Sequence, residues 1–248
     1  MNFDVIGTNI AKLWGEYWQV FLLQGLTTTL KLTTIAVILG VLLGTVVAIL
    51  KMSKSRIIRF LITVYIEVIR GTPILLQLYI FVFALPSLIP IKLSYFAWTA
   101  IALCINSSAY VSEVIRSGIQ AVDKGQSEAA RSLGLSESQT MVKIILPQAI
   151  RNILPALGNE FIMILKETSL ASTFFVGDLM TSYLTVKGAT YLGFECLIIV
   201  GMIYLCVTFP LSKLVAWFEK KMSTDKAYKK HNRMRKLKLE KGLHYGNH

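Results

Sequence analysis

The residues in this sequence that are best suited to chemistry are ionisable side chains inside a long apolar stretch. Glu160 and Glu167 are seven positions apart, so a helix would carry both on one face, with Thr168 beside them. An ionisable group inside a membrane-spanning helix is costly and usually marks the path of a substrate or an ion. Lys166 could instead pair with a carboxylate and only hold helices together. Glu160 has no cation three or four positions further on, so we predict that it lines a path; for Glu167 the two roles are equally good interpretations.

A second polar group is the triplet Asn106, Ser107 and Ser108, at the centre of the apolar segment 94–115. Polar side chains at that depth must either bond to neighbouring helices or line a cavity that holds water. Because three adjacent residues cannot all face one neighbour, the pattern favours a cavity. We therefore predict that all three line the same path as Glu160.

The composition places these groups in a membrane protein. Of the 248 residues, 54% are hydrophobic and 16% are charged, whereas soluble domains carry about 25% charged residues. The net charge of +12 would suit a nucleic-acid partner, but the basic residues flank apolar segments and crowd the C-terminus, as the orientation of a membrane protein requires. Cys104, Cys196 and Cys206 all lie in apolar runs, which indicates neither a disulfide framework nor a metal site.

Five apolar segments predict an all-α integral membrane protein with five transmembrane helices. They are residues 32–50, 57–85, 94–115, a segment that begins near Pro155, and residues 192–211. Basic residues in the loops 51–59 and 116–151 place both loops in the cytoplasm, so the N-terminus lies outside and the C-terminus inside. Gly40 and Gly44 form a G-x-x-x-G pattern, which permits close contact between helices.

The second segment is interrupted by Arg70, Gly71, Thr72 and Pro73. We interpret it as a kinked span that starts near the cytoplasmic interface, with Pro73 in the first turn of the resumed helix. The alternative is a helix broken near the membrane centre, whose positive half-helix end faces a substrate carboxylate.

Between the third and fourth segments lies a polar stretch, about residues 120–150, that is unlike the rest of the chain. Residues 126–133 are good helix formers, and Gly134 can end that helix in the left-handed conformation. Ser136 and Gln139 match a capping box that starts a second helix. We expect Pro147 to end or kink this second helix.

This stretch resembles the EAA loop of the membrane subunits of bacterial ABC importers. Glu128-Ala129-Ala130 is followed after three residues by Gly134 and nine residues later by Ile144-x-Leu146-Pro147. Further matches resemble the polar amino-acid permease branch and extend over about residues 24–221. They are Glu67-Val-Ile-Arg70-Gly71-Thr72-Pro73, Gln77, Ser108-Ala-Tyr110, Glu113, Arg116, Gly118-Ile119, Gly125-Gln126 and Leu165-Lys166-Glu167-Thr168-Ser169-Leu170.

The resemblance implies the permease subunit of an ATP-driven importer for polar amino acids, in the bacterial cytoplasmic membrane. The loop would dock on an ATPase subunit and move with it, while the spans rock about a central polar site. The expected docking residues are Glu128, Ala129, Ala130, Leu133, Gly134 and Leu135. The small side chains of Ala129 and Ala130 would let the partner approach closely. Implied partners are two ATPase subunits, a second permease subunit that is identical or different, and an extracellular or periplasmic substrate-binding protein.

The chain itself carries no phosphate-binding loop and no Ser, His and Asp set in its apolar core, so we expect neither an enzyme nor a cofactor. The alternative function is an autonomous ion-coupled secondary transporter or channel, in which Glu160 and Glu167 carry protons. Under the importer interpretation, Asn106 and the two serines supply donors to a substrate carboxylate, and ionised Glu160 accepts from its ammonium group. Acidic amino acids are then the least expected substrates.

The two ends of the chain lie outside the resemblance. Residues 1–23 predict an amphipathic helix in the membrane interface, or one packed against the edge of the bundle. The sequence of residues 174–187 predicts a segment on the outer side of the membrane that includes a short gating helix. Residues 222–248 predict a basic cytoplasmic tail, which fixes the orientation or lies on anionic headgroups.

Overall fold

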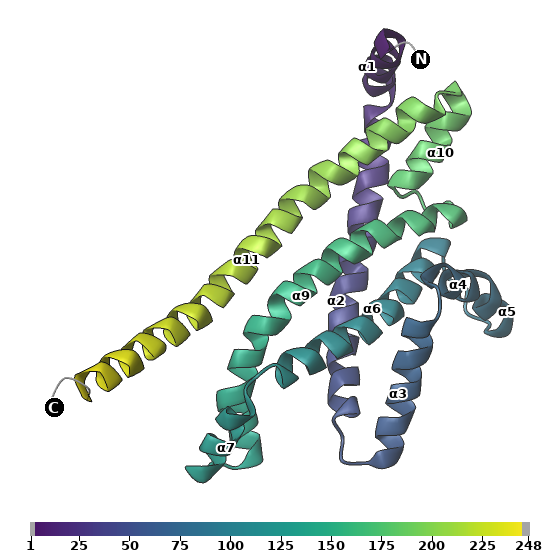
Figure 1. The fold of residues 1–248 in the computed structure, drawn as a ribbon. Helices are drawn as coiled ribbons and strands as arrows, with labels where there is room; N and C mark the ends of the chain where they lie inside the picture. The colour runs from purple at the N-terminus through teal and green to yellow at the C-terminus, as the bar shows by residue number, and fades with distance from the viewer. Residues whose placement is uncertain (1–2, 245–248) are drawn as a thin grey trace.

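The computed structural model describes the backbone of residues 3–244 and the side chains of residues 3–222, and the regular elements of that part of the chain are helices (Figure 1). It begins with one unbroken helical run from Phe3 to Lys51. The run consists of α1 (Phe3–Gln19), a π-helical segment (Val20–Leu26) and α2 (Thr27–Lys51). Leu13 and Phe21 are buried in a cluster with residues of α10 (Leu179–Thr190) and α11 (Gly193–His244). The predicted N-terminal helix is thus continuous with the first predicted span, and its place in the membrane interface stays a prediction.

The glycines of α2 pack against α6 (Tyr95–Gln120). A Cβ atom on Gly40 would lie 2.6 Å from the Oγ of Ser107, and one on Gly44 would lie 2.8 Å from the carbonyl oxygen of Ser108. Real side chains do not make contacts this short, so the absence of a side chain at both positions lets the two helices meet. The close helix contact predicted from the G-x-x-x-G pattern is confirmed.

The second predicted span consists of two helices at a steep angle. Here α3 (Arg56–Gly71) is followed by α4 (Ile74–Tyr79), a π-helical segment (Ile80–Ala84) and α5 (Leu85–Leu88). The bend between α3 and the helices after it is 105°, much sharper than the kink we expected. Pro73 is the N-cap of α4, with φ at −59°. It therefore introduces the resumed helix, and its ring prevents α3 from continuing.

The polar loop contains α7 (Lys124–Ser132) and α8 (Glu137–Thr140), and α8 continues through a π-helical segment (Met141–Ile145) into α9 (Leu146–Glu167). We expected Pro147 to end or kink the second helix. It does not end the helix, because the chain stays helical through this position. Pro147 lies in the first turn of α9, directly after the π-helical change of hydrogen-bond register, where a missing amide is tolerated. Pro155 lies inside α9 and not at its start.

After α9, a 3-10 helix (Thr168–Phe174) leads to α10, which is the short helix expected near residues 174–187, and then to α11. The backbone of α11 extends to His244, but the side chains beyond Met222 lie outside the described residues, and so does the predicted role of the basic tail.

The number of spans stays a prediction. By length and hydropathy, two helical runs of the described residues could cross a membrane, Phe3–Lys51 and Gly193–Met222, or three if the bent pair is one span. Figure 1 shows the turn between α2 and α3 at the same end of the molecule as α7, with the described N-terminal end at the opposite end. The two loops assigned to the cytoplasm from their charges therefore share one end.

Candidate coupling loop and substrate path

The turn after α7 is held by backbone hydrogen bonds around Gly134. The amide of Gly134 donates to the carbonyl of Arg131 at 3.0 Å, and the amide of Leu135 donates to the carbonyl of Ala130 at 3.2 Å. These two bonds form a Schellman motif, which needs a left-handed residue between them. Gly134 has φ of +84°, so the helix end predicted at this glycine is confirmed.

The next helix starts at the predicted capping box. The amide of Gln139 donates to the Oγ of Ser136 at 3.3 Å, and the amide of Ser136 donates to the Oε1 of Gln139 at 3.0 Å. Each side chain thus satisfies a backbone amide that the helix leaves without a partner. Because both ends of the turn are fixed, the residues between α7 and α8 keep a defined shape.

The loop presents some of the predicted docking residues and buries others. Glu128, Ala129 and Gly134 are exposed. Leu133 is 82% exposed. Ala130, in contrast, is only 6% exposed, so the expectation that it opens a face to a partner is wrong within this chain. Leu135, which is half-buried, donates its backbone amide to the carbonyl of Ala130.

The bend between α3 and α4 is closed by Gln77, which is buried. Its Nε2 donates to the carbonyl oxygens of Ile69 at 2.7 Å and Thr72 at 3.1 Å, and to the Oγ1 of Thr72 at 2.9 Å. The Oε1 of Gln77 accepts from the Nδ2 of Asn106 at 2.9 Å. One side chain therefore joins both arms of the bend to α6. Gly71 makes no close contact that would exclude a Cβ atom.

The polar triplet of α6 faces three different helices. Asn106 bonds to Gln77 on α4, Ser107 lies against Gly40 on α2, and the Oγ of Ser108 lies 2.6 Å from the hydroxyl of Tyr65 on α3. All three are buried in this chain. Ser107 and Ser108 therefore contribute to helix packing here. Contact with neighbouring helices was the alternative to a cavity that holds water. The sequence offered no signal for Tyr65.

Buried side-chain oxygens without a hydrogen-bond partner among the described residues include the Oδ1 of Asn106, the Oγ of Ser107, the Oε1 of Glu160 and the Oε2 of Glu167. Glu160 is 6% exposed, whereas Lys166 is exposed. No ion pair among the described side chains joins Lys166 to either carboxylate. Among the described residues, the purely internal pair that would explain these acids is therefore absent. Thr168 is buried, and its hydroxyl donates to the carbonyl of Leu165 at 2.7 Å.

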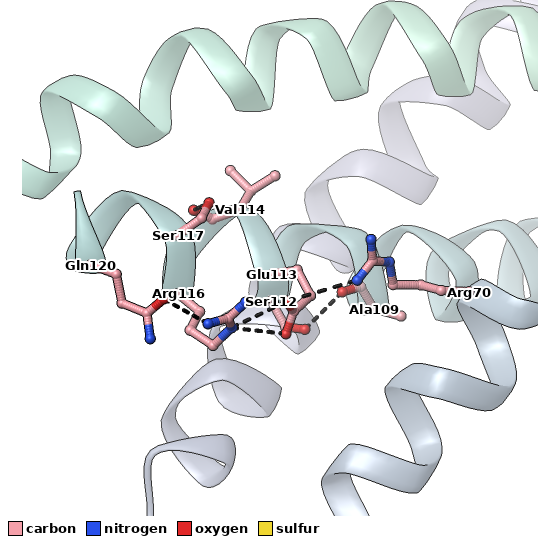
Figure 2. A network of polar contacts seen from close by, with 8 residues as sticks. All are labelled: Arg70, Ala109, Ser112, Glu113, Val114, Arg116, Ser117 and Gln120. Atoms are coloured by element: carbon pink, nitrogen blue, oxygen red, sulfur yellow. Dashed lines mark hydrogen bonds and ion pairs between the residues drawn. The ribbon is translucent and has the colours of Figure 1, made fainter.

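A charged network fixes the end of α3 to α6 (Figure 2). The carboxylate of Glu113 lies 2.7 Å from the Nη2 of Arg116 and 3.8 Å from the Nη1 of Arg70. Arg116 also donates to the Oε1 of Gln120 at 2.7 Å, and the guanidinium of Arg70 lies 5.4 Å from the centre of the Tyr110 ring. Arg70, which we assigned to the kink, is therefore anchored by partners that are distant in sequence.

Comparisons with known proteins agree with this arrangement. The family described as the binding-protein-dependent transport system inner membrane component matches residues 36–224. The arginine transport system permease protein ArtQ of Bacillus subtilis (strain 168) is 40% identical over 205 residues, 83% of this chain and 94% of that protein. The putative glutamine transport system permease protein GlnP of Rickettsia bellii (strain RML369-C) is 44% identical over 203 residues, 82% of this chain and 93% of that one.

Among solved structures, the chain resembles one described as the crystal structure of an amino acid ABC transporter with histidines. The TM-score is 0.80 at 48% identity, over 83% of this chain and 95% of the other. The inward-facing MetNI methionine ABC transporter shares the fold, with a TM-score of 0.64 at 15% identity over 80% of this chain and 96% of that chain. The chain belongs to the family of binding-protein-dependent transport system inner membrane components and is a permease subunit of a bacterial amino-acid ABC importer.

Proposed function

We propose that the loop from α7 to α8 is the part of this permease that receives the movement of the ATPase subunits. The observation that carries this proposal is Leu133, which is 82% exposed beside a turn fixed by the Schellman motif and the capping box. A large apolar side chain on a rigid polar loop gains about 1.5–3 kcal/mol when a partner covers it. The exposed Glu128 and Ala129 lie on the helix that leads into this turn.

The experiment that tests the docking is the variant Leu133→Ser. Because Leu133 is exposed, the change should alter the stability of the permease by less than about 0.5 kcal/mol. The affinity for the ATPase subunits should fall about tenfold or more, since the apolar contact is lost. The matched control is Leu88→Ser on α5, which removes a leucine that is 79% exposed away from the loop. Equal ATPase retention by the two variants during purification would contradict the docking role of Leu133.

We further propose that Glu160, Glu167 and Asn106 contribute acceptors to the path of the amino acid. The support is that Asn106 and Glu160 are buried and Glu167 is half-buried, and that each has an acceptor atom without a partner among the described residues. Buried acceptors of this kind carry a desolvation cost unless a ligand donates to them. An ammonium or guanidinium group supplies several donors and a compensating positive charge. Ser107 and Ser108, which are packed against other helices, act in the proposal as supports that fix Asn106.

The substrate class that fits these acceptors is a basic or neutral polar amino acid, and not an acidic one. Two carboxylates on one helix face repel a third. The similar proteins named for arginine and glutamine transport are consistent with this class. Glu160 and Glu167 would also serve the alternative function, a secondary transporter in which they carry protons. That alternative takes its energy from an ion gradient and not from ATP.

The bend at Arg70, Gly71, Thr72 and Pro73 is proposed to lie within the membrane. The 16 residues of α3 extend over about 24 Å, compared with a hydrocarbon core of about 30 Å. A helix that starts at the basic turn and stands along the membrane normal would reach the far half of the core before the bend. The complete importer in this proposal contains a second permease subunit, two ATPase subunits and an extracellular or periplasmic substrate-binding protein.

A further inference from the structure

A groove with a mainly apolar lining lies between α9 and α11, which pack side by side (Figure 1). The helices touch where Gly158 meets Val215: a Cβ atom on the glycine would lie 2.7 Å from the Cγ2 of the valine. Around this contact the groove has a volume of about 840 Å³ and is lined mainly by aliphatic and aromatic side chains. Its size is within the range of sites that hold small organic ligands.

One end of this groove is basic. Arg151 of α9 and Lys221 of α11 line it together with the apolar residues. The Nζ of Lys221 lies 5.0 Å from the centre of the Trp217 ring, and Trp217 is followed by Phe218 and then by the charged run that begins at Glu219. Trp beside Lys at the point where an apolar helix becomes charged is typical of the level of the lipid headgroups. The basic end therefore lies where the phosphate of a bound lipid would lie.

We propose that this groove binds an anionic phospholipid, with its acyl chains against the apolar lining and its phosphate near Arg151 and Lys221. Basic pockets between membrane helices on the cytoplasmic side bind anionic headgroups in this way. The charge is complementary, and the apolar lining is complementary to acyl chains. Glu219 and Arg151 both line the adjoining pocket, so the carboxylate moderates the positive charge at this end.

A second copy of the chain is the competing occupant. In a twofold dimer with this end of the groove on the symmetry axis, Arg151 and Lys221 would face the same two cations of the second copy. The charges at the basic end of the groove therefore favour a lipid over a second copy of the chain. The proposal does not depend on the coupling role of Leu133 or on the substrate path, and lipid binding is measured without transport.

The test is native mass spectrometry of the permease, purified with the subunits that accompany it, stripped of lipid and titrated with phosphatidylglycerol or with phosphatidylcholine of the same acyl chains. Each basic residue near an anionic surface contributes about a fivefold preference. The wild type should therefore prefer phosphatidylglycerol by roughly 25-fold, and the double variant Arg151→Gln/Lys221→Gln should bind the two lipids about equally. Leu214→Trp, which adds bulk to the lining, should weaken the binding of both.

The matched control is Lys12→Gln/Lys54→Gln, which removes two exposed cations that do not line the groove and should keep the preference. Equal binding of the two lipids by the wild type, or an equal loss in the control, would overturn the proposal. A separate measurement addresses the second copy: Leu214→Cys in a Cys206→Ser chain is oxidised in the membrane. No disulfide between copies is expected, and efficient formation of one would show that a second copy covers the groove and would also overturn the lipid site.

Discussion

The side chain of Gln77 donates a hydrogen bond to the carbonyl of Ile69, which lacks its helical donor because residue 73 is proline. In a continuous helix the amide four residues after Ile69 would bond to this carbonyl, but position 73 is proline and has no amide hydrogen. The Nε2 of Gln77 donates to it at 2.7 Å instead. The 105° bend is thus stabilised by a side chain from the helix that follows it.

Gln77→Leu should destabilise the permease by about 2 kcal/mol or more. The substitution leaves the carbonyls of Ile69 and Thr72 and the amide of Asn106 without this partner, and each buried polar group that loses its bond costs about 1–3 kcal/mol. The measurement is the temperature at which the purified complex loses its folded, monodisperse form. Gln19→Leu, an exposed position on α1, is the control and should unfold near the wild-type temperature. Equal unfolding temperatures for the two variants would show that Gln77 does not hold the bend.

Gly134→Val should leave membrane insertion of the permease intact and weaken its association with the ATPase. No atom lies within 4 Å of a Cβ built on Gly134, so the cost arises from its φ of +84° and not from a clash. A β-branched residue pays about 1 kcal/mol or more in this conformation, whereas asparagine adopts it more readily. We expect the Val variant to insert into the membrane but to lose ATPase subunits on purification, and Gly134→Asn to retain more of them. Wild-type ATPase binding and transport in the Val variant would argue against a fixed turn as the docking element.

Glu160→Gln should change which amino acids are transported. Removal of a buried carboxylate that accepts from a cationic group costs about 1.5–3 kcal/mol, which corresponds to a loss of roughly 10- to 100-fold in apparent affinity for basic substrates. Uptake of neutral substrates should fall less, and uptake of acidic ones should not fall. The control is Glu16→Gln, at an exposed position on α1. Unchanged uptake and apparent affinity for all three substrate classes would remove Glu160 from the path.

The parts of the loop that the sequence predicted correctly are those set by local chemistry. The conformation of Gly134 and the bonds between Ser136 and Gln139 depend on residues within a few positions, and each was anticipated from residue type and spacing. The burial of Ala130 was not, because its exposure depends on how α7 packs against the helical segments that follow it.

The helices that the α6 side chains contact also could not be predicted from local sequence patterns. Ser107 and Ser108 look alike in the sequence, yet one meets Gly40 and the other Tyr65, and both partners come from helices placed by tertiary packing. The sharpness of the bend had the same origin: Pro73 predicts an interruption, but the 105° angle is secured by Gln77 through its contact with Asn106. Proline forbids the regular bond and does not specify the angle that replaces it.

The central claim, that this chain imports amino acids only when ATPase subunits drive it, is tested most directly by uptake into proteoliposomes. The chain is reconstituted alone under an ion gradient, and in parallel with its ATPase subunits, substrate-binding protein and ATP. We predict no uptake by the chain alone, uptake of a basic or neutral amino acid by the complete system with ATP, and its loss in the Leu133→Ser variant. Uptake by the chain alone, driven by the ion gradient and abolished by Glu160→Gln, would contradict the account and identify a secondary transporter.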